Sequence, residues 1–116
     1  MPYTIDEEKT FPQSPDAVFN AVKAASAGLE GKILLEDIEG KQVNIQFPKT
    51  IHGKVLGDRT VFNTHVLLAD GTVNLVVEAF PVDAVGRKLM FGARKGVTRK
   101  VLDWFWAHIE HNLEDK

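Results

Sequence analysis

The residues best suited to chemistry gather in the last quarter of the chain. His108 and Asn112 are four residues apart, and the apolar residues around them recur at helical spacing, which predicts a helix over 97–113. Thr98 and Phe105 fall on the same apolar arc of that helix. A buried polar group without a partner costs about 1–3 kcal/mol. His108 and Asn112 therefore either bond to each other, to the backbone or to water, or they line a cavity and orient a ligand. Catalysis by His108 is a third alternative.

A basic stretch leads into this helix. Residues 87–100 contain no acidic residue, and Arg94, Lys95 and Arg99 lie where the free N–H groups and the dipole of a helix N-terminus favour an anion. A phosphate, a carboxylate or a nucleic-acid backbone could dock there. The favoured alternative is a solvated positive face, because runs of like charge are commonly just exposed. A nucleotide-binding glycine loop ending in Lys-Ser or Lys-Thr is absent, so an NTPase is not indicated.

Metal and thiol chemistry have little support in the sequence. His108 and His111 have a spacing that can hold a metal on one helix face, but no third ligand stands beside them in the sequence. We therefore predict no metal and no cofactor. The chain has no cysteine, which excludes disulfides and thiol nucleophiles. With 14 basic and 16 acidic residues the net charge is −2, so no general attraction to nucleic acid is expected.

Length and composition describe one domain. The chain has 116 residues, 44% of them hydrophobic and 26% charged, which predicts a single globular domain over 1–116 rather than a disordered chain. Its first ten residues are acidic and polar, unlike a signal peptide. Apolar runs stay well below the roughly 18–20 residues of a membrane span. These features predict a cytoplasmic protein without a membrane span.

The elements that would position His108 begin with a strand and a helix. Apolar residues among polar ones predict a strand over 3–11, which ends at Pro12. Ser14 is a suitable N-cap and is followed by Pro15, so a helix is predicted over 15–27. Residues 48–58 are predicted to form a loop or a short bent strand, and residues 87–92 a last strand.

The strongest hairpin signal is Asp70-Gly71. It joins predicted strands over 59–69 and 72–82, and counting outward from the turn fixes their register. The inner, apolar face then pairs Phe62 with Ala79, Thr64 with Val77, Val66 with Leu75, and Leu68 with Val73.

A second hairpin is predicted between residues 32 and 47. We expect a three-residue turn with Gly40 in the left-handed conformation, which pairs Ile33 with Ile45 and Leu35 with Val43 on one apolar face. A two-residue turn would instead put Glu36 opposite Val43 and mix the faces, so the longer turn is preferred.

The apolar arc of the last helix covers about 200°, more than a flat surface helix needs. We therefore expect an α+β fold in which a curved antiparallel sheet grips a long C-terminal helix, in the order strand, helix, four to six strands, helix. This order, the segment SPDAVFNAV at residues 14–22, and Trp104, Phe105 and Trp106 in the closing helix resemble the START-like, or helix-grip, superfamily in shortened form. That superfamily includes the birch-pollen-allergen-type, polyketide-cyclase and lipid-transfer branches. The resemblance implies binding of small hydrophobic molecules, and cyclisation in some members.

Three functions follow as hypotheses. The first is binding of a small apolar or amphipathic ligand between the helix and the sheet, in a cavity with Phe62, Val66 and Leu75 as walls and with a polar or aromatic lining of Thr64, Thr98, Phe105, His108 and Asn112. The second is a cyclase- or lyase-like enzyme on the same cavity, with His108 as general acid or base. The third is an interaction protein that uses the basic 87–100 edge or the half-apolar outer face of the main hairpin. That outer face could form a homodimer, although ordinary surface apolarity is the competing explanation.

Overall fold

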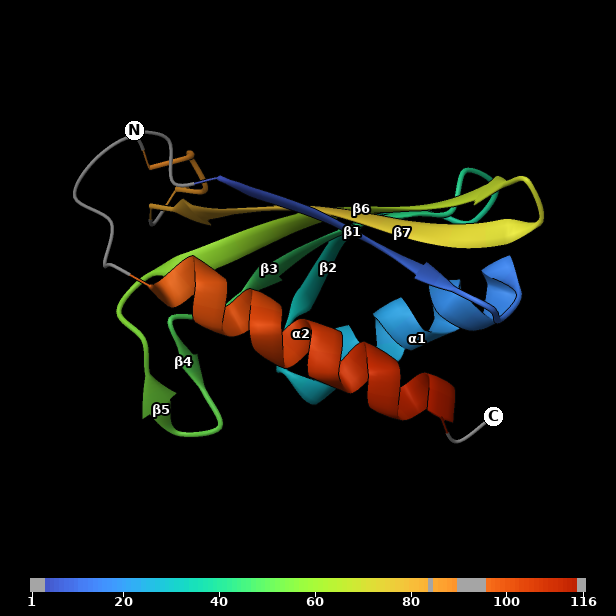
Figure 1. Cartoon of the computed structure of the whole chain (residues 1–116). Coiled ribbons are helices and arrows are strands. Elements are labelled where there is room, and N and C mark those ends of the chain that lie inside the picture. The colour runs from blue at the N-terminus through green and yellow to red at the C-terminus, as the bar shows by residue number, and fades with distance from the viewer. Residues whose placement is uncertain (1–3, 84, 90–95, 115–116) are drawn as a thin grey trace.

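The computed structural model describes residues 4–83, 85–89 and 96–114 (Figure 1). Two helices and seven strands follow one another in these ranges. In chain order they are β1 (Ile5–Phe11), α1 (Pro15–Gly28), β2 (Lys32–Asp37), β3 (Gln42–Phe47), β4 (Thr50–Ile51), β5 (Lys54–Val55), β6 (Arg59–Ala69), β7 (Thr72–Val82) and α2 (Val97–Glu114).

Five of the strands form one antiparallel sheet in the order β1-β7-β6-β3-β2, and β4 and β5 form a separate two-stranded hairpin. Both helices lie on the same side of the curved sheet, with α2 running along it (Figure 1). The predicted α+β class and the predicted order of elements are therefore confirmed.

The first helix begins as its sequence predicts. The Ser14 hydroxyl accepts a hydrogen bond from the Ala17 N–H at 3.1 Å, and Pro15 occupies the first turn, where its missing N–H costs nothing. The helix ends at Gly28, one residue beyond the predicted boundary. Its buried side chains are mostly small and face the core, which lets the helix lie close to its neighbours. They are Val18, Phe19, Ala21, Val22, Ala25 and Ser26.

The hairpin of β6 and β7 has the predicted register throughout. Phe62 lies opposite Ala79, and Val66 opposite Leu75. Asp70 and Gly71 have φ angles of 53° and 78°, as a two-residue turn with two left-handed positions requires. The inner face is buried between residues 62 and 66, whereas Leu68 near the turn is 65% exposed.

The pairing of β2 with β3 differs from the prediction. Ile33 lies opposite Ile45 as expected, but Val43 lies opposite Glu36 and not Leu35. The register shifts between Ile33 and Leu35 because a β-bulge adds one residue to β2. The predicted pair of Leu35 and Val43 is therefore wrong, since a bulge displaces every later pair by one position.

The turn of this hairpin was also predicted incorrectly. Lys41, with a φ of 53°, takes the left-handed conformation that was expected of Gly40. The Asp37 carboxylate accepts a hydrogen bond from the Gly40 N–H at 3.0 Å and stabilises the turn. All six residues of β2 are exposed, so this strand does not present the buried apolar face that its sequence suggests.

Residues 48–58 form the β4–β5 hairpin, whose turn consists of His52 and Gly53 with φ angles of 50° and 78°. This is the same two-residue turn chemistry as in the main hairpin, in a much shorter element. Of the predicted last strand, Lys88 forms an isolated bridge to Val82, and residues 90–92 lie outside the described residues.

The core between sheet and helix contains a cluster of three phenylalanines. Phe47 from β3, Phe62 from β6 and Phe105 from α2 are fully buried. Their rings meet edge to face, with centroids 4.7 Å apart for Phe47 and Phe62 and 5.0 Å apart for Phe62 and Phe105. Through Phe105, this cluster packs α2 against β3 and β6 of the sheet.

Candidate functional site

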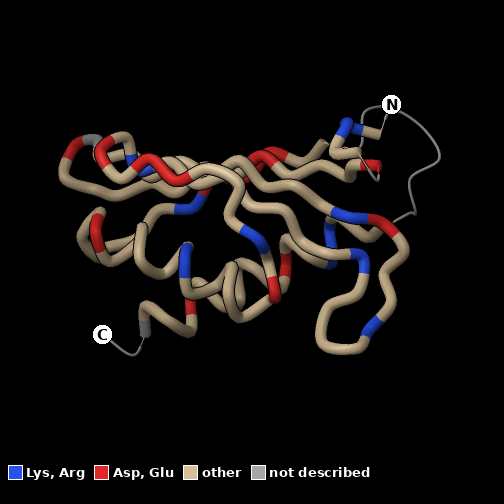
Figure 2. The backbone as a smooth tube through the Cα atoms, turned by 180° about the vertical axis from the view of Figure 1, so that it is seen from behind, with Lys and Arg blue, Asp and Glu red and all other residues tan. Residues whose placement is uncertain are grey.

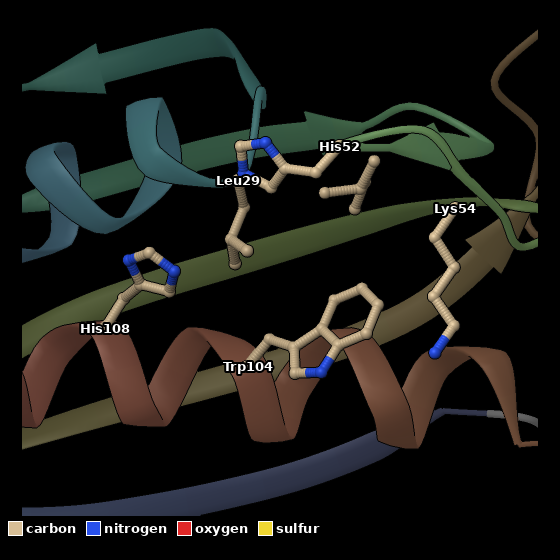
Figure 3. Close-up of a pocket in the computed structure, with 6 residues that line it drawn as sticks. Leu29, His52, Lys54, Trp104 and His108 are labelled. Atoms are coloured by element: carbon tan, nitrogen blue, oxygen red, sulfur yellow. The ribbon is translucent and has the colours of Figure 1, made fainter.

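A groove with a volume of about 320 Å³ opens beside α2. It lies between the helix, the end of α1 and the β4–β5 hairpin, as Figure 3 shows. Three separate parts of the chain thus build it. The groove is lined by Leu29, Ile51, His52, Lys54, Trp104 and His108.

The apolar part of the groove is rigidly placed. Leu29 directly follows α1 and is 2% exposed, and Ile51 of β4 is 1% exposed. Trp104 extends from α2 into the groove and is only partly buried. A partly exposed indole over two buried aliphatic side chains presents an apolar surface to any molecule that enters.

The ammonium group of Lys54 lies at the rim of the groove. Lys54 Nζ lies 5.7 Å from the ring centroid of Trp104, within the range of a cation–π contact. Within residues 4–83, 85–89 and 96–114, Lys54 forms no ion pair. The groove therefore has an apolar base and an ammonium group with spare hydrogen-bonding capacity.

His52 holds the hairpin that forms one side of the groove. Its main-chain N–H donates to the Glu30 carboxylate at 2.8 Å, and its Nε2 forms a hydrogen bond with the Gly28 carbonyl oxygen. Its Nδ1 lies 4.0 Å from the same carboxylate. These contacts tie a hairpin with only two residues in each strand to the end of α1.

His108 reaches the groove from α2 and packs against Gly28. A Cβ atom at Gly28 would lie 2.9 Å from both Cε1 and Nδ1 of the imidazole, so a larger residue there would require the imidazole to shift. In the described parts of the chain the imidazole nitrogens have no hydrogen-bond partner. Asn112 contacts the main chain of His108 and not its ring: the Asn112 Nδ2 donates a hydrogen bond to the His108 carbonyl oxygen at 2.8 Å.

The other predicted ligand-binding residues lie elsewhere. Thr64 is buried and donates to the Val43 carbonyl oxygen at 2.8 Å. Phe105 belongs to the aromatic cluster, and Thr98 is buried in the first turn of α2. Of the five, the structure places His108 in the groove, while Phe105 lies on the side of α2 that packs on the sheet and Thr64 is buried on β6.

The predicted anion-binding residues are only partly described. Arg94 and Lys95 lie outside the described residues. Arg99 donates from Nη1 and Nη2 to the two carboxylate oxygens of Glu7 at 2.7 and 2.9 Å, and from Nε to Asp103 at 3.0 Å. Its guanidinium group is therefore engaged with carboxylates of the protein itself.

Glu7 joins β1 to α2 through three donors. Besides the two bonds from Arg99, the Trp106 Nε1–H donates to Glu7 at 2.7 Å. The hydrogen bond from Arg99 lowers the pKa of the Glu7 carboxyl below its ordinary value, although partial burial opposes this effect. The same pairing raises the pKa of Arg99. We name Glu7, Arg99, Asp103 and Trp106 the edge clamp.

Within the described residues, neither the distribution of charged side chains nor the positions of acidic and histidine residues indicate a second binding site. Acidic and basic residues both occur on the sheet and on the helices (Figure 2). Across residues 4–83, 85–89 and 96–114, no group of three or more acidic or histidine residues could hold a metal ion. Neither described helix is both long enough and apolar enough to cross a membrane.

His108 and Trp104 are the groove residues that the sequence places on the apolar arc of the helix, whereas Leu29, Ile51, His52 and Lys54 were not expected there. The turn of the β4–β5 hairpin consists of His52 and Gly53, which both have positive φ angles. The sequence did not predict this turn, because a His-Gly pair is a weaker turn signal than Asp-Gly. Without the hairpin, nothing in the sequence brings Lys54 near Trp104.

The curved antiparallel sheet and the C-terminal helix that runs along it form an α+β helix-grip fold. Two solved helix-grip structures share it. Ara h 8.0201 superposes with a TM-score of 0.63 at 17% identity, covering 96% of this chain and 97% of that chain. Norcoclaurine synthase from Thalictrum flavum superposes with a TM-score of 0.56 at 13% identity, covering 98% and 88%. No protein-family model and no curated protein matches the sequence. The predicted resemblance is thus confirmed at the level of the fold.

Proposed function

We propose that this protein binds a small amphipathic anion in the groove beside α2. The apolar part of the ligand would lie on Leu29, Ile51 and Trp104, and its acidic group would pair with Lys54. The observation that carries the proposal is the combination of an apolar base with an ammonium group at its rim that forms no ion pair within the described residues. Ligand sites generally have this composition, mostly apolar with a few placed polar groups.

The size of the groove restricts the ligand. Its volume of about 320 Å³ is at the lower end of the range of roughly 300–1,000 Å³ for small-molecule sites. A planar aromatic acid suits it better than a long lipid, because the Trp104 indole offers a flat face for stacking. Lys54 lies over the same indole, so a bound acid would reach the ammonium group from the ring surface.

Catalysis on the same groove is the second candidate. The observation in its favour is that the His108 imidazole lines the groove and that its ring nitrogens have no hydrogen-bond partner among the described residues. A general base is normally oriented by a third group that fixes its tautomer, and no described residue does this for His108. Binding is therefore the function that the geometry supports best.

The interior sites predicted from the sequence remain predictions. A cavity lined by Thr64, Thr98, Phe105 and Asn112 would require the aromatic cluster to move apart. Anion binding by Arg94, Lys95 and Arg99 would require Arg99 to leave Glu7. A crystal structure with bound ligand would test both.

Two fluorescent naphthalene probes test the proposal. The sulfonate 1-anilinonaphthalene-8-sulfonate carries a negative charge, and N-phenyl-1-naphthylamine is its uncharged counterpart. We expect Trp104→Ala to weaken binding of both probes about tenfold, since it removes the stacking surface. We expect Lys54→Gln to weaken only the sulfonate, by about threefold to tenfold, because only that probe uses the charge.

The matched control is Lys100→Gln, which removes an exposed lysine of α2 that does not line the groove. It should leave both affinities unchanged. If neither Trp104→Ala nor Lys54→Gln alters binding of either probe, the groove is not the binding site. Native mass spectrometry of freshly purified protein would show whether a natural acid is already bound.

A further inference from the structure

The exposed edge of the sheet at β2 offers a second surface with specific chemistry. Every residue of β2 is exposed, including Ile33 at 37%, Leu34 at 51% and Leu35 at 52%. Among the described strands β2 pairs only with β3, so the other side of its backbone is an edge of the sheet. An edge strand of this kind is a template for pairing with another strand.

The register of β2 assigns each of its side chains to one face of the sheet. Ile33 and Glu36 lie opposite buried residues of β3 and therefore belong to the inner face. Lys32, Leu35 and Asp37 lie opposite the glutamine and asparagine residues of β3, on the outer face. The bulge inserts Leu34 next to Leu35.

We propose that β2 pairs antiparallel with β2 of a second copy of this chain. In the register that we infer, Lys32 lies opposite the partner's Asp37, Leu34 opposite the partner's Leu35, and Ile33 opposite the partner's Glu36. The pairs of Lys32 with Asp37 and of Ile33 with Glu36 then each unite residues of one face, as a continuous sheet requires. The two five-stranded sheets would join into one.

The sequence of β2 makes a second copy the fitting partner. Read from either end, the strand places a cation opposite an anion and a leucine opposite a leucine, so the surface is complementary to itself. Such complementarity is what a two-fold interface needs, because the same patch serves both subunits. A register slip by one residue would set outer Lys32 opposite the partner's inner Glu36, and the sheet faces would no longer match.

Sedimentation velocity over a wide range of protein concentration tests this proposal. We expect a monomer–dimer equilibrium that stops at the dimer, because pairing uses up the β2 edge of both copies. Lys32→Glu should weaken dimerisation at least about fourfold, since it turns an attractive cross-strand pair into a repulsive one at two symmetric places. The double variant Lys32→Glu with Asp37→Lys should restore most of the affinity.

Two further variants keep the result interpretable. Asp37 also bonds to the Gly40 N–H, so the double variant could disturb the turn. Leu34→Lys avoids the turn and should abolish the dimer by placing a charge against the partner's Leu35. Lys100→Glu makes the same charge change on an exposed residue of α2 and should have no effect.

A protein that stays monomeric at all concentrations would overturn the proposal. Dimerisation that is unaffected by Lys32→Glu and Leu34→Lys, or association that continues to larger species, would overturn it as well. Binding of the naphthalene probes is independent of these residues, so either proposal can fail alone.

Discussion

Removal of the Glu7 side chain measures what the edge clamp contributes to stability. In Glu7→Ala, the Trp106 Nε1–H loses its acceptor although the residue is only 3% exposed. A buried donor without a partner costs about 1–3 kcal/mol. The ion pair with Arg99 contributes less, about 0.2–1 kcal/mol, because the two side chains are 30% and 42% exposed. We therefore expect the free energy of unfolding to fall by about 2 kcal/mol.

Glu8→Ala is the matched control, since Glu8 is the next residue of β1 and is exposed on the opposite face. It should change the free energy of unfolding by less than about 0.5 kcal/mol. Urea unfolding followed by circular dichroism gives both values without depending on the fluorescence of Trp106. If Glu7→Ala and Glu8→Ala cost the same, the edge clamp does not stabilise the fold.

The contribution of Glu7 to the free energy of unfolding should depend on pH. The pKa of Glu7 lies below its ordinary value of 4.5, so its contribution is fully present above pH 4.5 and is lost as the pH falls through the lowered pKa. The difference in stability between the wild type and Glu7→Gln should therefore shrink on acidification below that value. A difference that grows toward acid pH would refute the assignment.

The remaining predictions concern Gly28 and two threonines. Gly28→Ala should cost about 1 kcal/mol because its Cβ would meet His108 at 2.9 Å, and His108→Ala in the same chain should recover the loss in a urea-unfolding cycle. Equal costs with and without His108 would exclude this contact as the cause. Thr60→Val should leave stability unchanged or raise it, since the buried Thr60 hydroxyl has no partner within the described parts of the chain. Thr64→Val on the same strand should cost about 1 kcal/mol, because the Thr64 hydroxyl bonds to Val43. Equal effects of these two variants would contradict the hydrogen-bond assignment.

The elements with strong local signals could be predicted from the sequence. Asp70-Gly71 defines a two-residue turn, and counting from it gives every pair of β6 and β7. Ser14 and Pro15 likewise mark the start of α1. The bulge in β2 has no such signal, because the extra residue lies in the apolar run Ile33-Leu34-Leu35 and leaves the apolar pattern readable in either register.

The groove was harder to predict than the fold. Helical periodicity placed His108 and Phe105 on one arc, but it could not say which part of that arc packs on the sheet. The aromatic cluster decides this, since Phe105 meets Phe62 and Phe47 and so leaves His108 facing α1. Such packing depends on residues far apart in the sequence, which is why periodicity alone suggested an interior site.

The edge clamp also has a consequence for how the chain folds as it is made. Glu7 and Arg99 are 92 residues apart, and β1 pairs with β7 and with no strand nearer in sequence. Contacts of such long range must close large loops first, which slows folding. During synthesis β1 therefore stays without a paired strand until β7 has been made, and the edge clamp can form only after α2 has been made. The charged residues Glu7 and Lys9 on its inner face would keep this waiting strand from pairing with other chains.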